Sequence, residues 1–262
     1  MVSLALVQRG AQEAWSAERQ PFLHLVAEYG PWVLAGLLAI VLVRSALRIR
    51  RYRAVAVLGA SEQEAVHAAV RDAESRTIGE IVPVVVERSD AHAGAAWVCA
   101  LVALLLGSAL LERFLPWSEP HWLLAAQLGL GAAGFLLART LPDLERLFVP
   151  PATAREVAEE QALIEFHVLG LRETRERTGV LLFVSLFEHQ VVVLGDSGIH
   201  AKVGDEHWKR TRDAVLAGIA RGSVRDGLVD GVRACGAILA EHFPVRPGDT
   251  NEIQDRVIVR AR

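Results

Sequence analysis

Three apolar runs dominate the pattern of hydrophobic and polar positions along the chain. Two of them, residues 94–111 and 122–138, contain no charged side chain and are joined by the short polar segment 112–121. As helices with a rise of 1.5 Å per residue they would extend roughly 25–27 Å, close to the ~30 Å hydrocarbon core of a bilayer. The pattern therefore predicts a transmembrane hairpin at residues 94–138.

The remaining apolar run, residues 29–43, is followed by apolar positions interspersed with arginines. Arg44 and Arg48 can extend their charged ends to a membrane interface while their stems stay in apolar surroundings. We therefore expect a first membrane span at about residues 29–47. A buried helix of a soluble domain is the alternative interpretation of this run.

The arginines that follow the first run predict the orientation of the protein in a membrane. The positive-inside rule places such a cluster in the cytoplasm, which puts the N-terminus outside. The loop 112–121 carries one arginine against two glutamates, and Arg139 and Arg146 follow the hairpin, so the same rule gives the same orientation there. We expect three spans, with everything from residue 139 onward in the cytoplasm. The cluster consists of Arg44, Arg48, Arg50, Arg51 and Arg53.

The segment before the hairpin has one helical and one strand-like pattern. Ser61 and Glu64 form a capping box, in which each side chain satisfies a free amide at a helix start, so a helix is expected there. The β-branched run 80–87 predicts a strand. Pro83 removes one hydrogen-bond donor from that strand, so we expect an edge position or a bulge.

The segment after the hairpin predicts a helix, two strands and two further helices. A second capping box begins at Thr153 and predicts a helix. The apolar runs 178–187 and 190–194 predict two paired strands joined by a turn. The last two helices are expected to begin at Asp205 and Ser223, both of which can cap a helix.

The strand before the hairpin needs a partner, because a single strand is not stable alone, and the strands after the hairpin are available. A hairpin returns the chain to the side it left, so one α/β domain interrupted by the hairpin is expected. The predicted organisation is an N-terminal segment 1–53 with its helix at about 29–47, a single domain of residues 54–93 plus 139–245, the hairpin 94–138, and a tail 246–262. Within the tail, residues 257–259 suit either an edge strand or disorder.

Composition supports an integral membrane protein and excludes one class of partner. The chain is 52% hydrophobic, and its mean hydropathy of +0.29 is high for a soluble protein. The net charge of −3, with no dominant basic face, gives no reason to expect nucleic acid. Cys99 and Cys235 lie in an apolar run and in an expected core helix, so no disulfide is expected.

Several motifs, taken in order, resemble the TPM-domain family. Residues 77–86, TIGEIVPVVV, are similar to its opening helix–strand signature, and residues 177–185, RTGVLLFVS, to its second strand. The resemblance covers about residues 60–244 outside the hairpin and is closest to a bacterial membrane branch in which apolar spans interrupt the domain. The third strand and following helix of the family are matched by residues 191–195, 198–200 and 204–208.

The resemblance implies a compact α/β sandwich, here interrupted by a transmembrane hairpin and preceded by one transmembrane helix. The family includes photosystem-maintenance proteins, receptor-associated auxiliary subunits and members assigned an acid phosphatase activity. For this chain it implies a location in the bacterial inner membrane. The expected partners are the lipid bilayer and another membrane or membrane-associated protein. The chain departs from the generic signature at Ile78 and Pro83.

Acidic residues supply the candidate site. Asp196 lies in a Gly-Asp-Ser-Gly loop directly after a strand, and ligands of open α/β sheets bind outside the carboxyl ends of parallel strands. Asp196, Glu80 and Asp205 could hold a divalent cation such as calcium or magnesium, with Asp196 and Glu80 as catalytic carboxylates in phosphoryl transfer. Ordinary turn and helix-cap chemistry is the alternative for Asp196 and Asp205.

Asp90, His200 and His207 are further candidates, although the spacing of the histidines matches no recognised metal-ligand pattern. The chain has no phosphate-binding loop, dinucleotide fingerprint, nucleophile elbow or zinc-protease motif. Two functions are therefore expected. The first is a membrane-anchored auxiliary or interaction protein at the cytoplasmic face, and the alternative is a metal-assisted phosphatase acting on phosphomonoesters.

Overall fold

The computed structural model describes residues 43, 52–114, 120–247 and 251–261. The chain divides into two units, Met1–Arg48 and Ile49–Arg262, and the second holds every described residue except Val43. The predicted first span at about 29–47 therefore lies outside the described residues, apart from Val43. The side chains of residues 112–114, 120, 122 and 205 also lie outside the described part.

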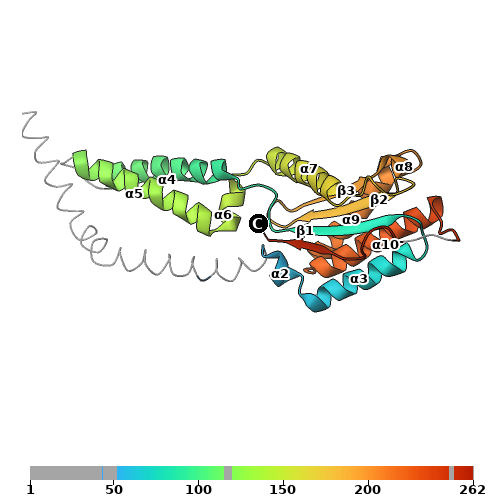
Figure 1. Ribbon diagram of the computed structural model, residues 1–262. Helices are drawn as coiled ribbons and strands as arrows, with labels where there is room; N and C mark the ends of the chain where they lie inside the picture. Colours follow the sequence, from blue (N-terminus) through green and yellow to red (C-terminus); the bar gives the residue numbers. More distant parts are fainter. Residues whose placement is uncertain (1–42, 44–51, 115–119, 248–250, 262) are drawn as a thin grey trace, which may run out of the picture. The chain divides into compact units, whose positions relative to one another are not determined.

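The described strands form one four-stranded sheet in the order β3-β2-β1-β4 (Figure 1). β1 pairs in parallel with β2 and β4, whereas β2 pairs antiparallel with β3. The predicted pairing of the strand before the hairpin with a strand after it is therefore confirmed. β4 comes from the predicted tail, so the sheet extends past the expected domain boundary at residue 245. The strands are β1 (Glu80–Val86), β2 (Gly179–Ser185), β3 (Gln190–Gly195) and β4 (Ile258–Arg260).

Pro83 occupies a part of β1 that pairs on one side only. β4 pairs with residues 84–86, so among the described strands the first half of β1 pairs with β2 alone. Every second residue of a strand directs its N–H group to the same side, and Ile81, Pro83 and Glu87 belong to one such set. The N–H groups of Ile81 and Glu87 donate to acceptors outside β2. The missing N–H of Pro83 therefore removes no bond to β2, and the expected edge position is confirmed for this half of the strand.

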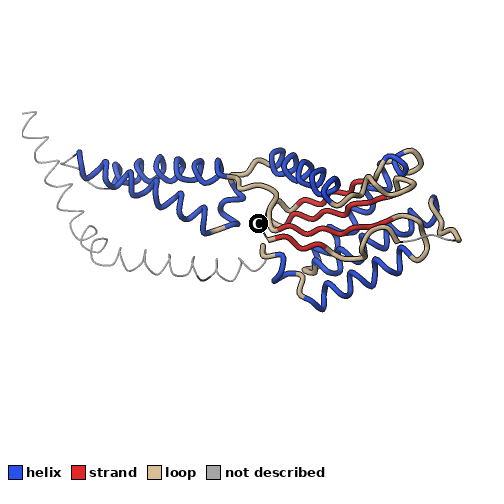
Figure 2. The backbone as a smooth tube through the Cα atoms, in the orientation of Figure 1, coloured by secondary structure: helices blue, strands red, loops and turns tan. Residues whose placement is uncertain are grey.

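Helices cover both faces of the sheet (Figures 1 and 2). On one face, Val82 and Phe183 belong to an apolar cluster with α7 (Pro151–Val168). On the other face, Ile81 and Leu182 belong to a cluster with α3 (Ala60–Glu74), α9 (Asp205–Ala220) and α10 (Val224–His242). β1 and β2 are buried at every position, as expected for strands covered on both sides. The expected mixed α/β fold is confirmed.

Both capping boxes expected from the sequence are wrong. α3 begins before Ser61, whose hydroxyl donates to Glu62. α7 begins at Pro151 rather than Thr153, because proline presets the helical φ angle and lacks an N–H that a first turn leaves unpaired anyway. The cap at Ser223 is confirmed. Three short helices were not expected: α2 (Ala54–Val57), α6 (Pro142–Leu147) and α8 (Ser197–His200).

The predicted hairpin is present as two packed helices, α4 (Ala93–Phe114) and α5 (Pro120–Thr140). Gly134 permits their close approach, because a Cβ at this position would lie 2.6 Å from the Cβ of Ala103. By length and composition, both helices are long and apolar enough to cross a membrane. Their outer side chains are exposed, with Leu106 at 63% and Leu128 at 64%.

Candidate functional site

Glu80 and Asp196 lie at the edge of the sheet where its parallel strands begin. Glu80 pairs with Gly179, and the Asp196 N–H donates to the Gly179 carbonyl at 2.9 Å. The expectation that Asp196 follows the carboxyl end of a parallel strand is wrong, because β3 runs antiparallel to β2. Asp196 therefore lies at the opposite edge from the carboxyl ends of β1 and β2.

The side chains of Glu80 and Asp196 use different partners. Glu80 Oε1 accepts from the Glu252 N–H at 2.9 Å, and Asp196 Oδ1 accepts from the Ser197 N–H at 2.6 Å to cap α8. Among the described residues, no group of three or more His, Cys, Asp or Glu is placed to hold a metal ion. The side chain of Asp205, the first residue of α9, lies outside the described part. The cation set of Glu80, Asp196 and Asp205 stays a prediction.

One carboxylate oxygen on each of these two residues is nevertheless unusual. Glu80 Oε2 and Asp196 Oδ2 are buried and have no hydrogen-bond partner among the described residues. Burial raises the pKa of the Glu80 carboxyl, against the opposing effect of the N–H groups of Glu252 and Ile253. A buried acceptor without a donor is costly, so a bound proton or cation would relieve either position.

The other candidates are separated from this edge or from one another. His200 ends α8 and is exposed, whereas His207 lies in the first turn of α9 with its ring 6.1 Å from that of His242. Asp90 follows β1 at the opposite edge of the sheet, where its carboxylate accepts from the His92 N–H at 2.8 Å. Of these three residues, only Asp90 lies at the edge of the sheet where β1 and β2 end.

At the carboxyl ends of β1 and β2, a buried polar cluster joins the sheet to the hairpin. Its centre is Glu188, whose side chain is fully buried in the turn between β2 and β3. The Glu188 carboxylate accepts from the Ser89 N–H at 3.1 Å, from the His92 Nε2–H at 2.6 Å and from the Ser185 hydroxyl. These donors replace the water that the carboxylate has lost. The junction cluster consists of Arg88, Ser89, His92, Arg139, Glu145, Ser185 and Glu188.

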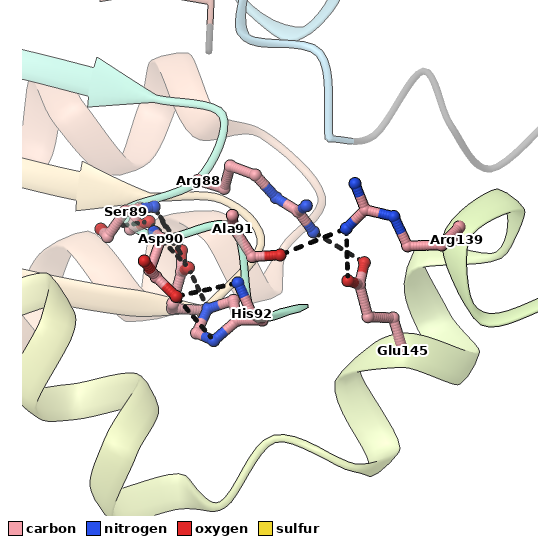
Figure 3. Close-up of polar contacts among 9 residues, drawn as sticks. Arg88, Ser89, Asp90, Ala91, His92, Arg139 and Glu145 are labelled. Atoms are coloured by element: carbon pink, nitrogen blue, oxygen red, sulfur yellow. Dashed lines mark hydrogen bonds and ion pairs between the residues drawn. The ribbon is translucent and has the colours of Figure 1, made fainter. Parts of the chain in front are cut away.

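A second carboxylate of the junction cluster, that of Glu145 in α6, binds one arginine from each end of the hairpin (Figure 3). Arg88, which follows β1, donates to Glu145 Oε2 at 2.8 Å. Arg139, near the end of α5, donates to Glu145 Oε1 at 3.4 Å and to the Ala91 carbonyl at 3.3 Å. Because the Glu145 side chain is only 3% exposed and Arg88 is mostly buried, the ion pair between these two residues is largely protected from solvent screening. Glu145 therefore ties the entry of the hairpin to its exit.

Aromatic contacts complete this junction. The ring centre of Phe187 lies 4.2 Å from the Arg88 guanidinium carbon and 5.3 Å from the His92 ring. The Tyr52 ring lies 5.9 Å from Phe187, and the Tyr52 hydroxyl donates to Asp143 at 2.5 Å. His92 also has a φ of 45°, a left-handed conformation that is unfavourable for a side chain with a Cβ. The surrounding contacts hold the backbone in this conformation.

A groove of about 1030 Å³ opens at the same edge of the sheet. Ser185 and His189 line it from the end of β2 and the following turn, Leu216 from α9 and Arg225 from the first turn of α10. Burial lowers the pKa of His189, and the positive charge of Arg146 adds to this effect. The lining mixes apolar and polar side chains, as binding grooves do.

Sequence reasoning placed Glu188 in a turn and missed its role. A local signal was present, because Ser185 and Glu188 are polar positions at the end of an otherwise apolar run. Ser89 and His92 similarly stand directly before the apolar helix of the hairpin. Their meeting depends on the pairing of β1 with β2, which joins positions almost one hundred residues apart. Periodicity along one element does not report such a contact.

Comparison with known proteins bears on the resemblance drawn from the motifs. The family model of the TPM domain matches residues 140–238. The NMR structure of the BA42 protein from the psychrophilic bacterium Bizionia argentinensis is similar, with 24% sequence identity and a TM-score of 0.48, covering 78% of this chain and 95% of that chain. No curated protein matches this sequence. The family-model match confirms the resemblance to the TPM-domain family over residues 140–238, whereas the bacterial membrane branch stays a prediction.

Proposed function

We propose that this TPM-domain protein is an auxiliary or interaction protein of the bacterial inner membrane that presents its α/β domain at the cytoplasmic face. The junction cluster carries this proposal, because Arg88 and Arg139, from the two ends of the hairpin, bind the same buried carboxylate of Glu145. A domain tied to both ends of a membrane hairpin is held against the bilayer surface. There it would meet other proteins of the membrane.

The lipid bilayer is the first proposed partner. Exposed apolar residues such as Trp97 and Leu136, at 66% and 61%, continue along both helices of the hairpin. An apolar surface of this extent is costly in water and favourable in hydrocarbon. Arg139, near the end of α5, and Arg146, in α6, lie where the hairpin meets the domain, which by the positive-inside rule favours a cytoplasmic position for the domain.

The second proposed partner is another membrane protein that packs against α5. A Cβ added at Gly129 would meet nothing within 4 Å, so this small position is open on the surface of the helix. Helices associate in membranes where small residues let their backbones approach closely. Gly129 is therefore a suitable contact point for a helix of a second protein.

A green fluorescent protein fused after Arg262 tests both parts of this proposal. We expect the fusion to fluoresce in the cell membrane, because this reporter folds in the cytoplasm and fails when exported unfolded. After mild detergent extraction, native electrophoresis should show a complex larger than the fusion alone. Gly129→Leu should return the fusion to its monomeric size, because the larger side chain blocks close helix packing.

Gly94→Leu is the matched control. Gly94 lies in α4 and, like Gly129, has nothing within 4 Å of an added Cβ. Gly94→Leu should therefore keep the complex. Loss of the complex in this variant too would show that the effect is not specific to Gly129. A non-fluorescent fusion would contradict the orientation, and a complex made of this chain alone would contradict the proposed partner.

A metal-assisted phosphatase acting on phosphomonoesters is the second candidate, and the unpartnered oxygens of Glu80 and Asp196 favour it. Together with Asp205, these carboxylates would supply the oxygen ligands that magnesium and calcium prefer. Glu80 and Asp196 would then also be the catalytic carboxylates. Their present partners are separate, so a cation would have to draw the two side chains together.

Phosphomonoester hydrolysis by the purified full chain tests this second candidate. With magnesium or calcium present, Asp196→Asn and Glu80→Gln should each lower the rate by at least about 100-fold, the usual loss for a catalytic carboxylate. The control is Glu176→Gln, because Glu176 is exposed and pairs with Arg246 at the surface. Equal rates for Asp196→Asn and the parent, or no hydrolysis by the parent, would rule out the catalytic role.

A further inference from the structure

The end of the chain crosses the free half of β1. This C-terminal strap, residues 251–260, begins beside the first residue of β1, where the Glu252 N–H donates to Glu80 at 2.9 Å. Its last residues form β4 and pair with the end of β1. The Glu252 carboxylate also accepts from the Arg175 N–H at 3.0 Å. The strap therefore covers the part of β1 that β4 leaves unpaired.

Two carboxyl groups meet where the strap passes α3. Glu74, the last residue of α3, accepts from the Ile81 N–H at 2.8 Å through Oε1. Its other oxygen, Oε2, is buried without a donor among the described residues, and the Asp255 carboxyl lies within hydrogen-bonding reach of Glu74. Asp255 is itself held by a hydrogen bond from the Asn251 amide. Two ionised carboxylates are both acceptors, so they cannot bond to each other.

Other charged groups around Glu74 add to the repulsion between the carboxylates of Glu74 and Asp255. Glu80 on β1 and Asp255 on the strap both face it, and Glu252 on the strap lies next to Glu80. Arg71 on α3 is engaged elsewhere, with Glu64 at 2.8 Å, and Arg175 approaches Glu252 at 3.8 Å. Burial raises the pKa of Glu74 to about 9, and the negative charges of Glu80 and Asp255 contribute to the rise.

Either a cation or a proton could resolve the contact between Glu74 and Asp255. A cation needs several ligands, and no group of three or more His, Cys, Asp or Glu in the described chain is placed to hold one. We propose that Glu74 keeps its proton at neutral pH and donates it to Asp255, forming a latch that holds the C-terminal strap on β1 and releases it as the pH rises.

The direction of the pH effect follows from proton linkage. With the strap closed, Glu74 binds its proton up to a pH of about 9, whereas a Glu74 side chain exposed by opening of the strap has the ordinary pKa of 4.5. Closing the strap therefore takes up a proton between these two values. The stabilisation is complete below pH 4.5, falls as the pH rises, and is lost above about pH 9. Opening uncovers the edge of β1 and the apolar side chains of the strap.

Hydrogen exchange of the full chain in mild detergent measures this opening. The measured quantity is the protection factor, which already corrects for the intrinsic effect of pH on exchange. The relevant protection factors are those of the Glu252 and β4 amides, compared between pH 6 and 8. In the parent protein they should fall by up to about tenfold per pH unit, the slope for one linked proton. Amides of β2 should show no such slope.

Three variants separate Glu74 from its neighbours. Glu74→Gln keeps a donor toward Asp255 at every pH, so the slope should drop below about threefold per pH unit. Glu80→Gln should keep the steeper slope, and so should Glu64→Gln, which changes an exposed glutamate on the same helix. If Glu74→Gln fails to fold, Asp255→Asn provides the same test, because its amide can donate to ionised Glu74.

Three results would overturn the latch. Equal protection factors at pH 6 and 8 in the parent would show that no proton is linked to closing. A slope lost in Glu80→Gln and kept in Glu74→Gln would assign the proton to Glu80. Loss of protection on adding EDTA at pH 6 would show that a cation, rather than a proton, joins the two carboxylates.

Discussion

Glu188→Ala is expected to lower the free energy of unfolding by about 3–5 kcal/mol, the usual cost of breaking a buried ionic network by removing one member. Glu188 is fully buried and accepts from the Ser89 N–H, the Ser185 hydroxyl and the His92 ring. Removing the carboxylate leaves these donors buried and unpaired, and it leaves a cavity beside Phe187. Urea unfolding of the full chain in mild detergent, followed by circular dichroism, measures the loss.

The same variant should loosen the connection between the sheet and the hairpin. Arg88 directly precedes Ser89, so trypsin should cut after Arg88 faster in Glu188→Ala than in the parent. The control is Glu176→Ala, because Glu176 forms an exposed ion pair with Arg246 and should contribute less than about 1 kcal/mol. A loss of stability no larger than that of Glu176→Ala, with unchanged cleavage, would show that the junction cluster does not stabilise the fold.

Gly218→Ala should destabilise the protein, although alanine in a helix interior is ordinarily the more stable residue by about 0.5–1 kcal/mol. Gly218 in α9 faces Gly227 in α10, and a Cβ on Gly218 would lie 2.2 Å from the Gly227 Cα. The obstacle is backbone, so the two helices must move apart and lose contact with the sheet. We expect a net loss near the upper end of the about 1–3 kcal/mol typical of overpacking.

Gly227→Ala should show the same reversal of sign, because its Cβ would lie 2.6 Å from the Val215 carbonyl oxygen. Gly204→Ala is the control, since nothing lies within 4 Å of a Cβ there and its φ of −75° suits alanine. Thermal unfolding of the three variants provides the comparison. If Gly218→Ala matched Gly204→Ala in stability, the close crossing of α9 and α10 would be contradicted.

Most long elements could be predicted from the sequence because each is marked by its own apolar run or pattern. The apolar runs of the hairpin, the β-branched run 80–87 and the apolar run 178–187 all appear close to their expected positions. Helix starts were less predictable, because capping patterns at Ser61 and Thr153 competed with neighbouring residues that begin the helix earlier. Short helices such as α6 have too few residues to show a period.

The sequence already contained the information needed to place Asp196 at the correct edge of the sheet. The turn expected between residues 178–187 and 190–194 already implied that these strands run antiparallel. An antiparallel third strand ends beside the start of the second, so Asp196 had to lie at the edge where β1 and β2 begin. The rule for ligand sites concerns the other edge, where the structure places the junction cluster and the groove.

The sequence by itself determined two apolar helices in a hairpin, an α/β domain, and the pairing of a strand before the hairpin with strands after it. These follow from local apolar runs and patterns and from the need of every strand for a partner. Only the tertiary structure decided which charged residues are buried. Glu188 meets Ser89, Glu145 meets Arg88 and Glu74 meets Asp255 across 99, 57 and 181 positions, because the sheet joins distant segments. Burial and partners at such positions depend on which elements meet, and a pattern along one element does not contain that information.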